Sequence, residues 1–336
     1  MVGRFTKINF HARICGAYVK SGISHIRQRC NVQITVVGHI CFDIIKYPDG
    51  KENQSYGGIF YTVAALANLL GQDDVVIPVF GVGKSDYDEV ISLLNKYGNV
   101  DTSAIYRMNG KTNQVTLTYQ SDNCRVECSK NISEEIPIKK IRPTLSSDMI
   151  IINMISGFDI SLETLDEIRI HVREENKPIY MDIHCLVCGV NPDFTRFYRP
   201  LEGWRRWLFM LHGVQMNEKE AKALTNEFSD ENILASHILA LNTNVLHITR
   251  GERGSTIYVN EHKNVKRYDF NPIKPEKAVD TTGCGDVYAA AYSVSYLKWK
   301  DIIKASSYAN EVASFNAQFP GSSGINELSK FKSKLL

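Results

Sequence analysis

The chain lacks any run of apolar residues long enough to cross a bilayer, which excludes a transmembrane helix of ordinary length. It also lacks a charge excess, because 39 Lys and Arg stand against 37 Asp and Glu in 336 residues. Nucleic acid and membrane surfaces attract proteins with a strong positive balance, so neither is expected as a partner. We therefore expect a soluble globular protein, and the composition leaves monomer and homodimer open.

Cysteine spacing and a missing phosphate-binding motif narrow the class further. The eight cysteines follow no disulfide framework, which favours a reducing compartment and predicts a cytoplasmic protein. Cys185 and Cys188 have the C-x-x-C spacing, but a structural zinc site needs a second such pair. Ordinary cysteines without a metal or redox function are therefore the simpler interpretation. The Walker A pattern G-x-x-x-x-G-K-[ST] is absent, which excludes a P-loop kinase.

Acidic residues are missing from the first 42 positions. The same stretch carries the basic residues Arg4, Lys7, Arg13, Lys20, Arg27 and Arg29. This composition is typical of an organelle transit peptide, of a disordered basic tail, or of a start codon placed too far upstream. Regular patterning begins near residue 32, so we expect residues 1–31 to be an extension outside the core and residues 32–336 to form one domain.

Short apolar segments alternate with helical patterns along this domain. The strand-like segments are residues 32–37, 149–155, 179–183, 214–217 and 245–249. The helical patterns are residues 57–70, 161–175, 218–224, 231–241, 286–297 and 301–315. Buried strands that alternate with helices predict an α/β fold, namely a three-layer α/β/α core with a mostly parallel sheet.

Two segments break this rhythm. Residues 46–56 are polar with a Pro-Asp-Gly turn, and residues 115–126 alternate apolar and polar side chains like an antiparallel strand. Together they predict a small β-flap beside the core, which would serve as a lid that excludes water from a cleft. An ordinary surface hairpin is the alternative.

The residues most informative about chemistry are 280–286, with the sequence DTTGCGD, which lead into an alanine-rich helical run. Glycines let the backbone approach a ligand, and the free N–H groups of Gly283, Cys284 and Gly285 at a helix start would form an anion hole. Asp286 beside it would take the proton from an attacking hydroxyl during phosphoryl transfer. The spacing alone fits equally well a capped helix end, in which Asp286 only complements the helix dipole.

This heptapeptide resembles the D-T-x-G-A-G-D signature of the PfkB/ribokinase family of carbohydrate kinases, with Cys284 at the second small position. The resemblance extends from about residue 32 to about residue 324. It implies a ribokinase-like fold and an ATP-dependent kinase that phosphorylates a hydroxyl of a small sugar or sugar-like acceptor, with Asp286 as the general base.

The resemblance also assigns acceptor-binding residues. Residues 36–43 resemble the family's first strand, so Asp43 is expected to bind substrate hydroxyls, from which a carboxylate accepts hydrogen bonds. Gly57 and Gly58 begin a segment similar to the family signature G-G-x-x-x-N-x-A, and they are expected to let backbone N–H groups approach the substrate.

Departures from the family pattern bear on the acceptor. Cys41 stands where the family often has Asn, Thr62 stands at the Asn of the glycine signature, and Ile59 stands where ribokinases proper have Lys. The last two argue against ribose. A nucleoside is an alternative acceptor, with an aromatic platform as its expected sign. The candidates for that platform are Phe42, Tyr56 and Tyr119. A catalytically silent ligand-binding regulator on the same fold is a further alternative.

Donor and metal sites follow from later motifs of the resemblance, which implies ATP and Mg²⁺ as cofactors. The expected nucleotide-binding residues are Asn217, Thr249, Gly251, Gly254 and Asn310. Glu220 of the N-x-x-E motif is expected to hold Mg²⁺ through water, and the same spacing from Asn217 is that of a capping box. A monovalent cation such as K⁺ is a further expectation beside Asp280.

Cys284 lies within the expected anion hole. We expect its backbone N–H, rather than its thiol, to act on the phosphate. We also expect the helix dipole to lower the pKa of the thiol.

Removing residues 1–30 is expected to leave a folded and active protein, because regular patterning starts later. The thermal unfolding midpoint and the phosphotransfer rate of the truncated chain should match those of the full chain. Aggregation or loss of activity after truncation would show that this segment contributes to the core.

Overall fold

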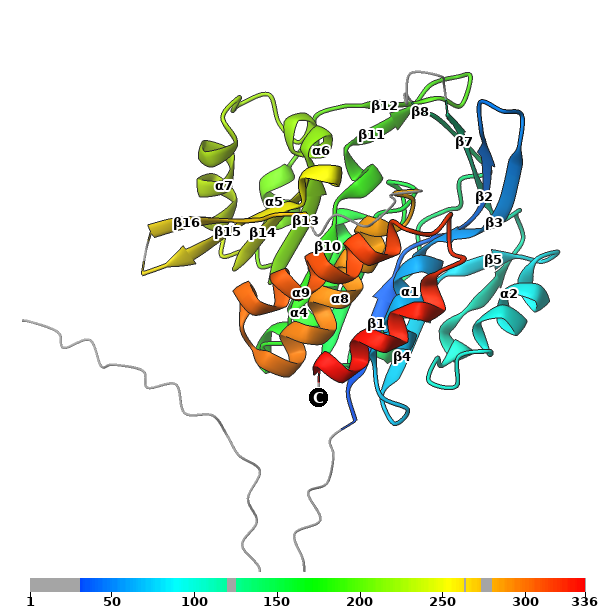
Figure 1. Ribbon diagram of the computed structural model, residues 1–336, viewed down its shortest axis with the longest axis horizontal. Coiled ribbons are helices and arrows are strands. Elements are labelled where there is room, and N and C mark those ends of the chain that lie inside the picture. The colour runs from blue at the N-terminus through cyan, green and yellow to red at the C-terminus, as the bar shows by residue number, and fades with distance from the viewer. Residues whose placement is uncertain (1–30, 120–124, 263, 273–279, 336) are drawn as a thin grey trace, which may run out of the picture. The chain divides into compact units, whose positions relative to one another are not determined.

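The structure, a computed structural model, describes residues 31–119, 125–262, 264–272 and 280–335 (Figure 1). The chain divides into two units, residues 1–30 and residues 31–336, and every described residue belongs to the second. Apart from Asn31, the predicted basic extension therefore lies outside the described residues, and its role stays a prediction.

The described residues form a central sheet of eight strands in the order β16-β15-β14-β13-β10-β9-β1-β4. Its strands are β1 Gln33–Val37, β4 Val75–Val79, β9 Met149–Asn153, β10 Ile179–Asp182, β13 Gly213–Asn217, β14 Val245–Thr249, β15 Ser255–Glu261 and β16 Asn264–Phe270. The pairs from β4 to β14 are parallel, whereas β15 and β16 pair antiparallel at one edge. The strands predicted from apolar runs are all confirmed: β1, β9, β10, β13 and β14.

Three strands of the sheet escaped the sequence analysis, namely β4, β15 and β16. β4 contains Pro78, which lacks the N–H that a ladder needs, and a proline argues against a central strand. The structure resolves the conflict because β4 lies at the edge of the sheet. β16 is exposed along most of its length, so no apolar pattern marks it.

Burial explains why the inner strands read as continuous apolar runs. Every residue of β9 is buried, because a parallel sheet covered on both faces has no solvent side. Asn153 ends this strand, and a buried amide requires hydrogen-bond partners. That requirement points to the carboxyl edge of the sheet as a polar site.

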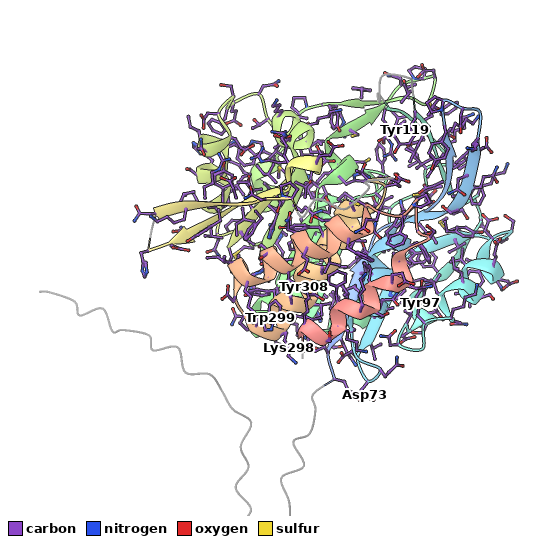
Figure 2. All side chains as sticks on the ribbon, viewed as in Figure 1. Asp73, Tyr97, Tyr119, Lys298, Trp299 and Tyr308 are labelled. Carbon is purple, nitrogen blue, oxygen red and sulfur yellow. The ribbon has the colours of Figure 1, made fainter. Side chains whose placement is uncertain are left out.

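One helical layer is formed by α1 Ile59–Leu69, α8 Cys284–Trp299, α9 Ile302–Asn316 and the 3-10 segment η6 Ile325–Leu335 (Figure 1). Trp299 of α8 meets Tyr308 of α9 edge-on, with ring centroids 5.5 Å apart (Figure 2). Among the described residues, none of the helices has both the length and the apolar character that a membrane crossing requires.

The second helical layer contains α4 Leu162–Val172, α5 Trp204–Leu208, α6 Glu218–Ala223 and α7 Glu231–Leu239. Right-handed crossovers from β9 to β10 and from β13 to β14 step across the sheet in the opposite direction to the step from β1 to β4. The helices of those crossovers, α4, α6 and α7, therefore cover the face opposite α1. α4 begins as predicted, since Ser161 Oγ accepts a hydrogen bond from the Thr164 N–H at 3.3 Å.

The predicted flap is present as a separate sheet in the order β3-β2-β7-β8. Its strands are β2 Ile40–Lys46, β3 Glu52–Gly58, β7 Asn113–Tyr119 and β8 Arg125–Lys130. Residues 120–124 of the predicted flap segment lie outside the described residues. A short hairpin, β11 Cys188–Val190 and β12 Arg196–Tyr198, follows on from β8, where the Ser129 N–H donates to the Phe194 carbonyl at 2.9 Å. We call the four-stranded sheet β3-β2-β7-β8 the lid.

Short elements complete the described part of the chain. They are β5 Gly81–Gly83, β6 Tyr106–Met108, α2 Tyr87–Leu94, α3 Ile138–Ile141, η1 Thr102–Ala104, η2 Arg142–Thr144, η3 Arg173–Glu175, η4 His184–Val187 and η5 Gly251–Arg253.

Candidate active site

A cavity of about 620 Å³ lies where the carboxyl ends of the sheet strands meet the start of α8 and the inner face of the lid. β10, β13 and β14 end there with Asp182, Asn217 and Thr249. Open α/β sheets bind their ligands at this edge. The predicted site residues that line the cavity are Asp43, Gly58, Asn217, Glu220, Thr249, Gly251, Gly254, Gly283, Cys284, Gly285, Asp286 and Asn310.

The carboxylate of Asp286 is held in the first turn of α8 by two donors. Its Oδ1 accepts hydrogen bonds from Asn153 Nδ2 at 2.8 Å and from Thr62 Oγ1 at 3.3 Å. Burial raises the pKa of Asp286 to about 6, while the charge of His184 and the two hydrogen bonds oppose that rise. A carboxyl with this pKa is largely ionised at pH 7 and is still basic enough to take a proton from a hydroxyl.

The sequence analysis missed the two residues that hold Asp286. Asn153 donates to Thr62 Oγ1 at 2.7 Å as well as to Asp286, so the three side chains form one cluster. Each carried a signal: Asn153 is the polar end of an apolar strand, and Thr62 occupies the Asn position of the glycine signature. Their meeting point could not be predicted, because 133 residues separate Asn153 from Asp286.

The backbone before Asp286 forms the tight turn that the glycines predicted. Gly283 has φ 75°, and a Cβ there would lie 2.4 Å from Cδ1 of Tyr61. The Cys284 N–H already donates to the Thr281 carbonyl at 3.2 Å. In the first helical turn the Gly285 N–H has no intrahelical acceptor. The Gly285 N–H is therefore a better candidate for the predicted anion hole than the Cys284 N–H, to which the prediction gave an equal part.

The prediction of a lowered thiol pKa at Cys284 was wrong. Burial, with smaller contributions from the nearby carboxylates of Asp280 and Asp286, raises the pKa of Cys284 to about 12 against a hydrogen bond with Asn316. The dipole argument considered only the helix end and not the desolvation of the sulfur. Cys284 is therefore a neutral small side chain at the edge of the cavity, which agrees with the expectation that its thiol takes no chemical part.

Asp43 lies on the inner face of the lid, buried to 4% exposure. A Cβ on Gly57 would lie 1.8 Å from Asp43 Oδ2, and a Cβ on Gly58 would lie 2.6 Å from Cys41 Sγ. Gly57 itself is not among the cavity-lining residues. The first glycine of the signature therefore makes room for the Asp43 carboxylate, and only Gly58 faces the cavity.

The aromatic platform expected for a nucleoside is not built from the predicted side chains. Phe42 and Tyr56 meet edge-on with centroids 5.6 Å apart, and Tyr56 donates to Glu89 Oε2 at 3.0 Å. Tyr119, which is labelled in Figure 2, stacks on Tyr47 with centroids 5.9 Å apart. Of the described residues that line the cavity, none is one of these.

Asn217 and Glu220 form the predicted capping box at the start of α6. The Asn217 N–H and Nδ2 donate to the two carboxylate oxygens of Glu220 at 2.7 and 2.6 Å. The described residues contain no group of three or more His, Cys, Asp and Glu side chains that could hold a metal ion. The predicted role of Glu220 in holding Mg²⁺ through water stays a prediction.

The donor end of the cavity requires glycine at one position in particular. Gly254 has φ 83°, and a Cβ there would lie 2.1 Å from the Phe270 carbonyl oxygen. Asn310 closes this end, where it accepts from Ser255 Oγ at 3.1 Å and donates to the Asn271 carbonyl at 2.9 Å. Small and apolar side chains complete the lining: Pro272, Ala313, Ser314 and Ala317.

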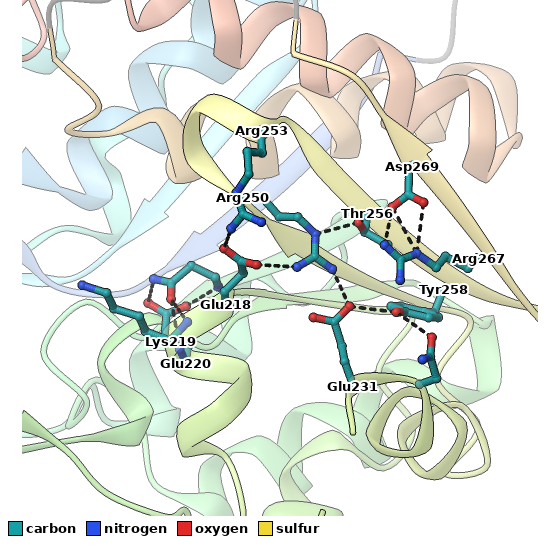
Figure 3. A network of polar contacts seen from close by, with 12 residues as sticks. Glu218, Lys219, Glu220, Glu231, Arg250, Arg253, Thr256, Tyr258, Arg267 and Asp269 are labelled. Carbon is teal, nitrogen blue, oxygen red and sulfur yellow. Dashed lines mark hydrogen bonds and ion pairs between the residues drawn. The ribbon is translucent and has the colours of Figure 1, made fainter. Parts of the chain in front are cut away.

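An ion-pair network supports this loop from outside the cavity (Figure 3). Arg250 donates to Glu218 Oε1 at 2.6 Å and to Thr256 Oγ1 at 2.7 Å, and it also pairs with Glu231. Arg253 joins Glu218 from the other side. The arginine therefore ties the end of β14 to the starts of α6 and α7.

Asp280 lies outside the cavity lining, where its carboxylate anchors the loop before α8. Oδ1 accepts from the Thr282 N–H at 2.9 Å, from Thr282 Oγ1 at 2.7 Å and from the Tyr119 hydroxyl at 3.4 Å, and Oδ2 accepts from the Gly321 N–H at 2.9 Å. Oδ1 therefore accepts three hydrogen bonds and Oδ2 accepts one. The monovalent cation stays a prediction.

Residues 194–328 match the pfkB family carbohydrate kinase. A cytidine kinase of Thermococcus kodakarensis is 25% identical over 277 residues, which cover 81% of this chain and 91% of that protein. A ribokinase of Bacillus subtilis is 38% identical over 108 residues, about a third of either chain.

Solved structures share the fold at low identity. A ribokinase of Thermotoga maritima superposes with a TM-score of 0.70 at 19% identity, covering 90% of this chain and 99% of the other. A pyrophosphate-dependent kinase in the ribokinase family gives a TM-score of 0.71 at 21% identity, covering 86% and 96%. The match over residues 194–328 is therefore to the pfkB family of carbohydrate kinases, and the described part of the chain has the fold of ribokinase-family structures.

The pH dependence of activity is expected to follow Asp286. A general base acts only when deprotonated, so kcat/KM should fall as the pH drops below about 6. Asn153→Leu removes a hydrogen bond that favours the ionised form, so the pKa should rise and the acidic limb should move upward by about one pH unit. Thr62→Val should move it in the same direction.

The matched control is Thr144→Val, because the Thr144 hydroxyl donates to the Ile141 carbonyl at 2.8 Å and Thr144 is not among the described residues that line the cavity. An acidic limb that stays in place in Asn153→Leu and in Thr62→Val would remove both residues from the control of Asp286.

Arg250→Met is expected to destabilise the fold by about 1–3 kcal/mol, because the partly buried Glu231 loses its paired cation and Glu218 keeps only Arg253. Arg267→Met is the control, since its pair with Asp269 is exposed and should contribute at most about 1 kcal/mol. Urea unfolding measures both free energies. Equal losses in the two variants would mean that the Arg250 network has no special weight.

Proposed function

We propose that this protein is an ATP-dependent phosphotransferase that phosphorylates a hydroxyl of a small sugar or sugar-like acceptor. The carrying observation is the buried Asp286 carboxylate, with its pKa raised to about 6, next to the backbone turn of Gly283–Gly285 in one cavity. A base for the hydroxyl proton and donors for the phosphoryl charge are the two parts that this reaction needs.

In the proposed reaction the acceptor hydroxyl lies against Asp286, and other hydroxyls of the acceptor bind Asp43. Asp286 takes the proton as the hydroxyl oxygen attacks the terminal phosphorus of the donor. The N–H groups at the start of α8 hold the charge on the phosphoryl oxygens. Mg²⁺, carried by the donor phosphates, would neutralise further charge, with Asn217 and Glu220 as the residues that face it through water.

ATP is favoured as the donor by the shape of the cavity beyond Thr249. The space continues past Gly251 and Gly254 to Asn310 and is lined there by small side chains, as a nucleoside group requires. Some of the structural neighbours are pyrophosphate-dependent, and pyrophosphate would leave this end empty. The two donors can be separated by direct competition in the same assay.

The acceptor class is supported by relatives as well as by Asp43. Two of the relatives are a cytidine kinase and a ribokinase, and the acceptors in their names, cytidine and ribose, both contain a ribose ring. A carboxylate that accepts hydrogen bonds from hydroxyls suits such a ring.

Asp286→Asn should remain folded and bind ATP but lose turnover by about 10²–10⁴-fold, the usual contribution of a general base. The measurement is coupled ADP release with a panel of sugars, polyols, sugar phosphates and nucleosides, and release of inorganic phosphate is measured instead when pyrophosphate replaces ATP. A variant that keeps more than about a tenth of the wild-type kcat would refute the base assignment. ATP binding without transfer to any acceptor would instead support the silent regulator.

A further inference from the structure

A charged pair that no step of the proposed reaction uses lies where the inner face of the lid meets the β11–β12 hairpin. Arg196 of β12 and Glu127 of β8 both line the cavity, and Arg196 Nη1 lies 3.6 Å from Glu127 Oε2. The side chain of Arg196 is only 7% exposed and that of Glu127 is 23% exposed. A buried guanidinium is costly unless its position is built by surrounding acceptors.

Protein groups fix the orientation of Arg196. Its Nε donates to Ser129 Oγ at 2.5 Å, its Nη2 donates to the Ile155 carbonyl at 3.3 Å, and its Nη1 also contacts Cys185 Sγ. A guanidinium has five N–H groups, so at least one remains for a ligand in the cavity. Arg196 is therefore a preorganised donor rather than a flexible surface charge.

The strand register sets the distance between this pair and the acceptor carboxylate. Asp43 of β2 lies opposite Val115 of β7, and Val115 lies opposite Ser129 of β8, the residue that binds Arg196. Neighbouring strands are about 4.8 Å apart, so the row from Asp43 to Ser129 spans roughly 10 Å. This is about twice the breadth of a single sugar ring.

The surface between the two ends is apolar. Val115 and Leu117 face the cavity from β7, and Cys41 and Ile155 join them in one buried cluster. Sugars and polyols present hydroxyls in every direction and gain little from such a surface, whereas a flat heterocycle gains from burying both of its faces.

We infer that the acceptor is a nucleoside, whose ribose binds Asp43 and whose base lies on the Val115–Leu117 surface with its polar edge against Arg196 and Glu127. This inference rests on the proposed phosphotransfer and names the substrate class for it. Nucleobase edges carry a hydrogen-bond acceptor next to a donor, as in the ring nitrogen and amino group of cytosine or adenine. Arg196 supplies the complementary donor, and Glu127 supplies the complementary acceptor.

The predicted aromatic side chains do not line the cavity, but a nucleobase can bind there without them. Base recognition in an enzyme pocket uses apolar side chains as well as rings, together with hydrogen bonds to the base edge. Aliphatic residues contribute area without stacking, so the edge contacts carry more of the selectivity. The charged pair is therefore the part to test.

The test compares kcat/KM for cytidine, uridine, adenosine, inosine and guanosine with kcat/KM for ribose and myo-inositol, using the full chain and ATP. The wild type should prefer at least one nucleoside over ribose by about tenfold or more, as lost hydrogen bonds to a charged group predict. Glu127→Gln replaces an acceptor by an amide of the same size and should lower that selectivity ratio by about tenfold or more. Arg196→Lys keeps the charge but loses the planar fork and should lower it as well.

Glu52→Gln is the matched control, because Glu52 lines a separate hollow on the outer face of the lid and should leave the ratio unchanged. Thermal unfolding of each variant confirms that it is folded. Phosphorylation of sugars or polyols in preference to all nucleosides would overturn the inference while the proposed function stands. An unchanged ratio in Glu127→Gln would also overturn it. Failure to phosphorylate any acceptor would count against the proposed function itself.

Discussion

Burial of the Asp286 carboxylate is the constraint on which the rest of the site depends. Desolvation alone would favour the protonated acid, which could not act as a base at neutral pH. Asn153 and Thr62 supply the hydrogen bonds that keep the ionised form accessible, and both come from elements that the fold must bring together: the end of β9 and the first turn of α1. The relative placement of β9, α1 and α8 therefore also sets the pKa of Asp286.

A second set of contacts ties the start of α8 to the interior. Gln215 Nε2 donates to the Gly285 carbonyl and to Asp182 Oδ2, both at 2.9 Å, and its Oε1 accepts from the Tyr180 hydroxyl at 3.0 Å. That hydroxyl lies 3.2 Å from His247 Nδ1. Burial lowers the pKa of His247 to about 3, so the ring is neutral and can form a hydrogen bond with the Tyr180 hydroxyl. A satisfied buried chain of this kind fixes orientation, because any member that moves leaves another without a partner.

The sequence predicted the parts of the fold that follow from local pattern, and it failed where packing decides. The apolar strands β1, β9, β10, β13 and β14 were recognisable because a covered parallel sheet needs continuous apolar runs. β4 was missed because Pro78 is tolerated only by its edge position, which is a property of the whole sheet.

The candidate site divides in the same way. Asp286, Asp43, Gly58 and the glycines at the start of α8 were expected from short local motifs, and the structure brings them to the lining of one cavity. Thr62 was read only as a departure from the family pattern, and its hydrogen bond to Asp286 depends on a contact across 224 residues. The pKa of Cys284 was wrong in sign because the dipole of its own helix is local, whereas its burial and the neighbouring carboxylates arise from tertiary structure.

Asp280 shows how the lid and the anion hole are joined without a ligand in between. Its carboxylate accepts from Thr282, which shapes the turn before α8, and from Tyr119 at the end of β7 in the lid. The Gly321 N–H on the segment after α9 binds the other oxygen. Movement of the lid strand must therefore either break the Tyr119 hydrogen bond or pull on the loop that carries Gly283. The Tyr119 contact is long at 3.4 Å, so it is the weakest of these bonds and the least costly link between the lid and the turn to break.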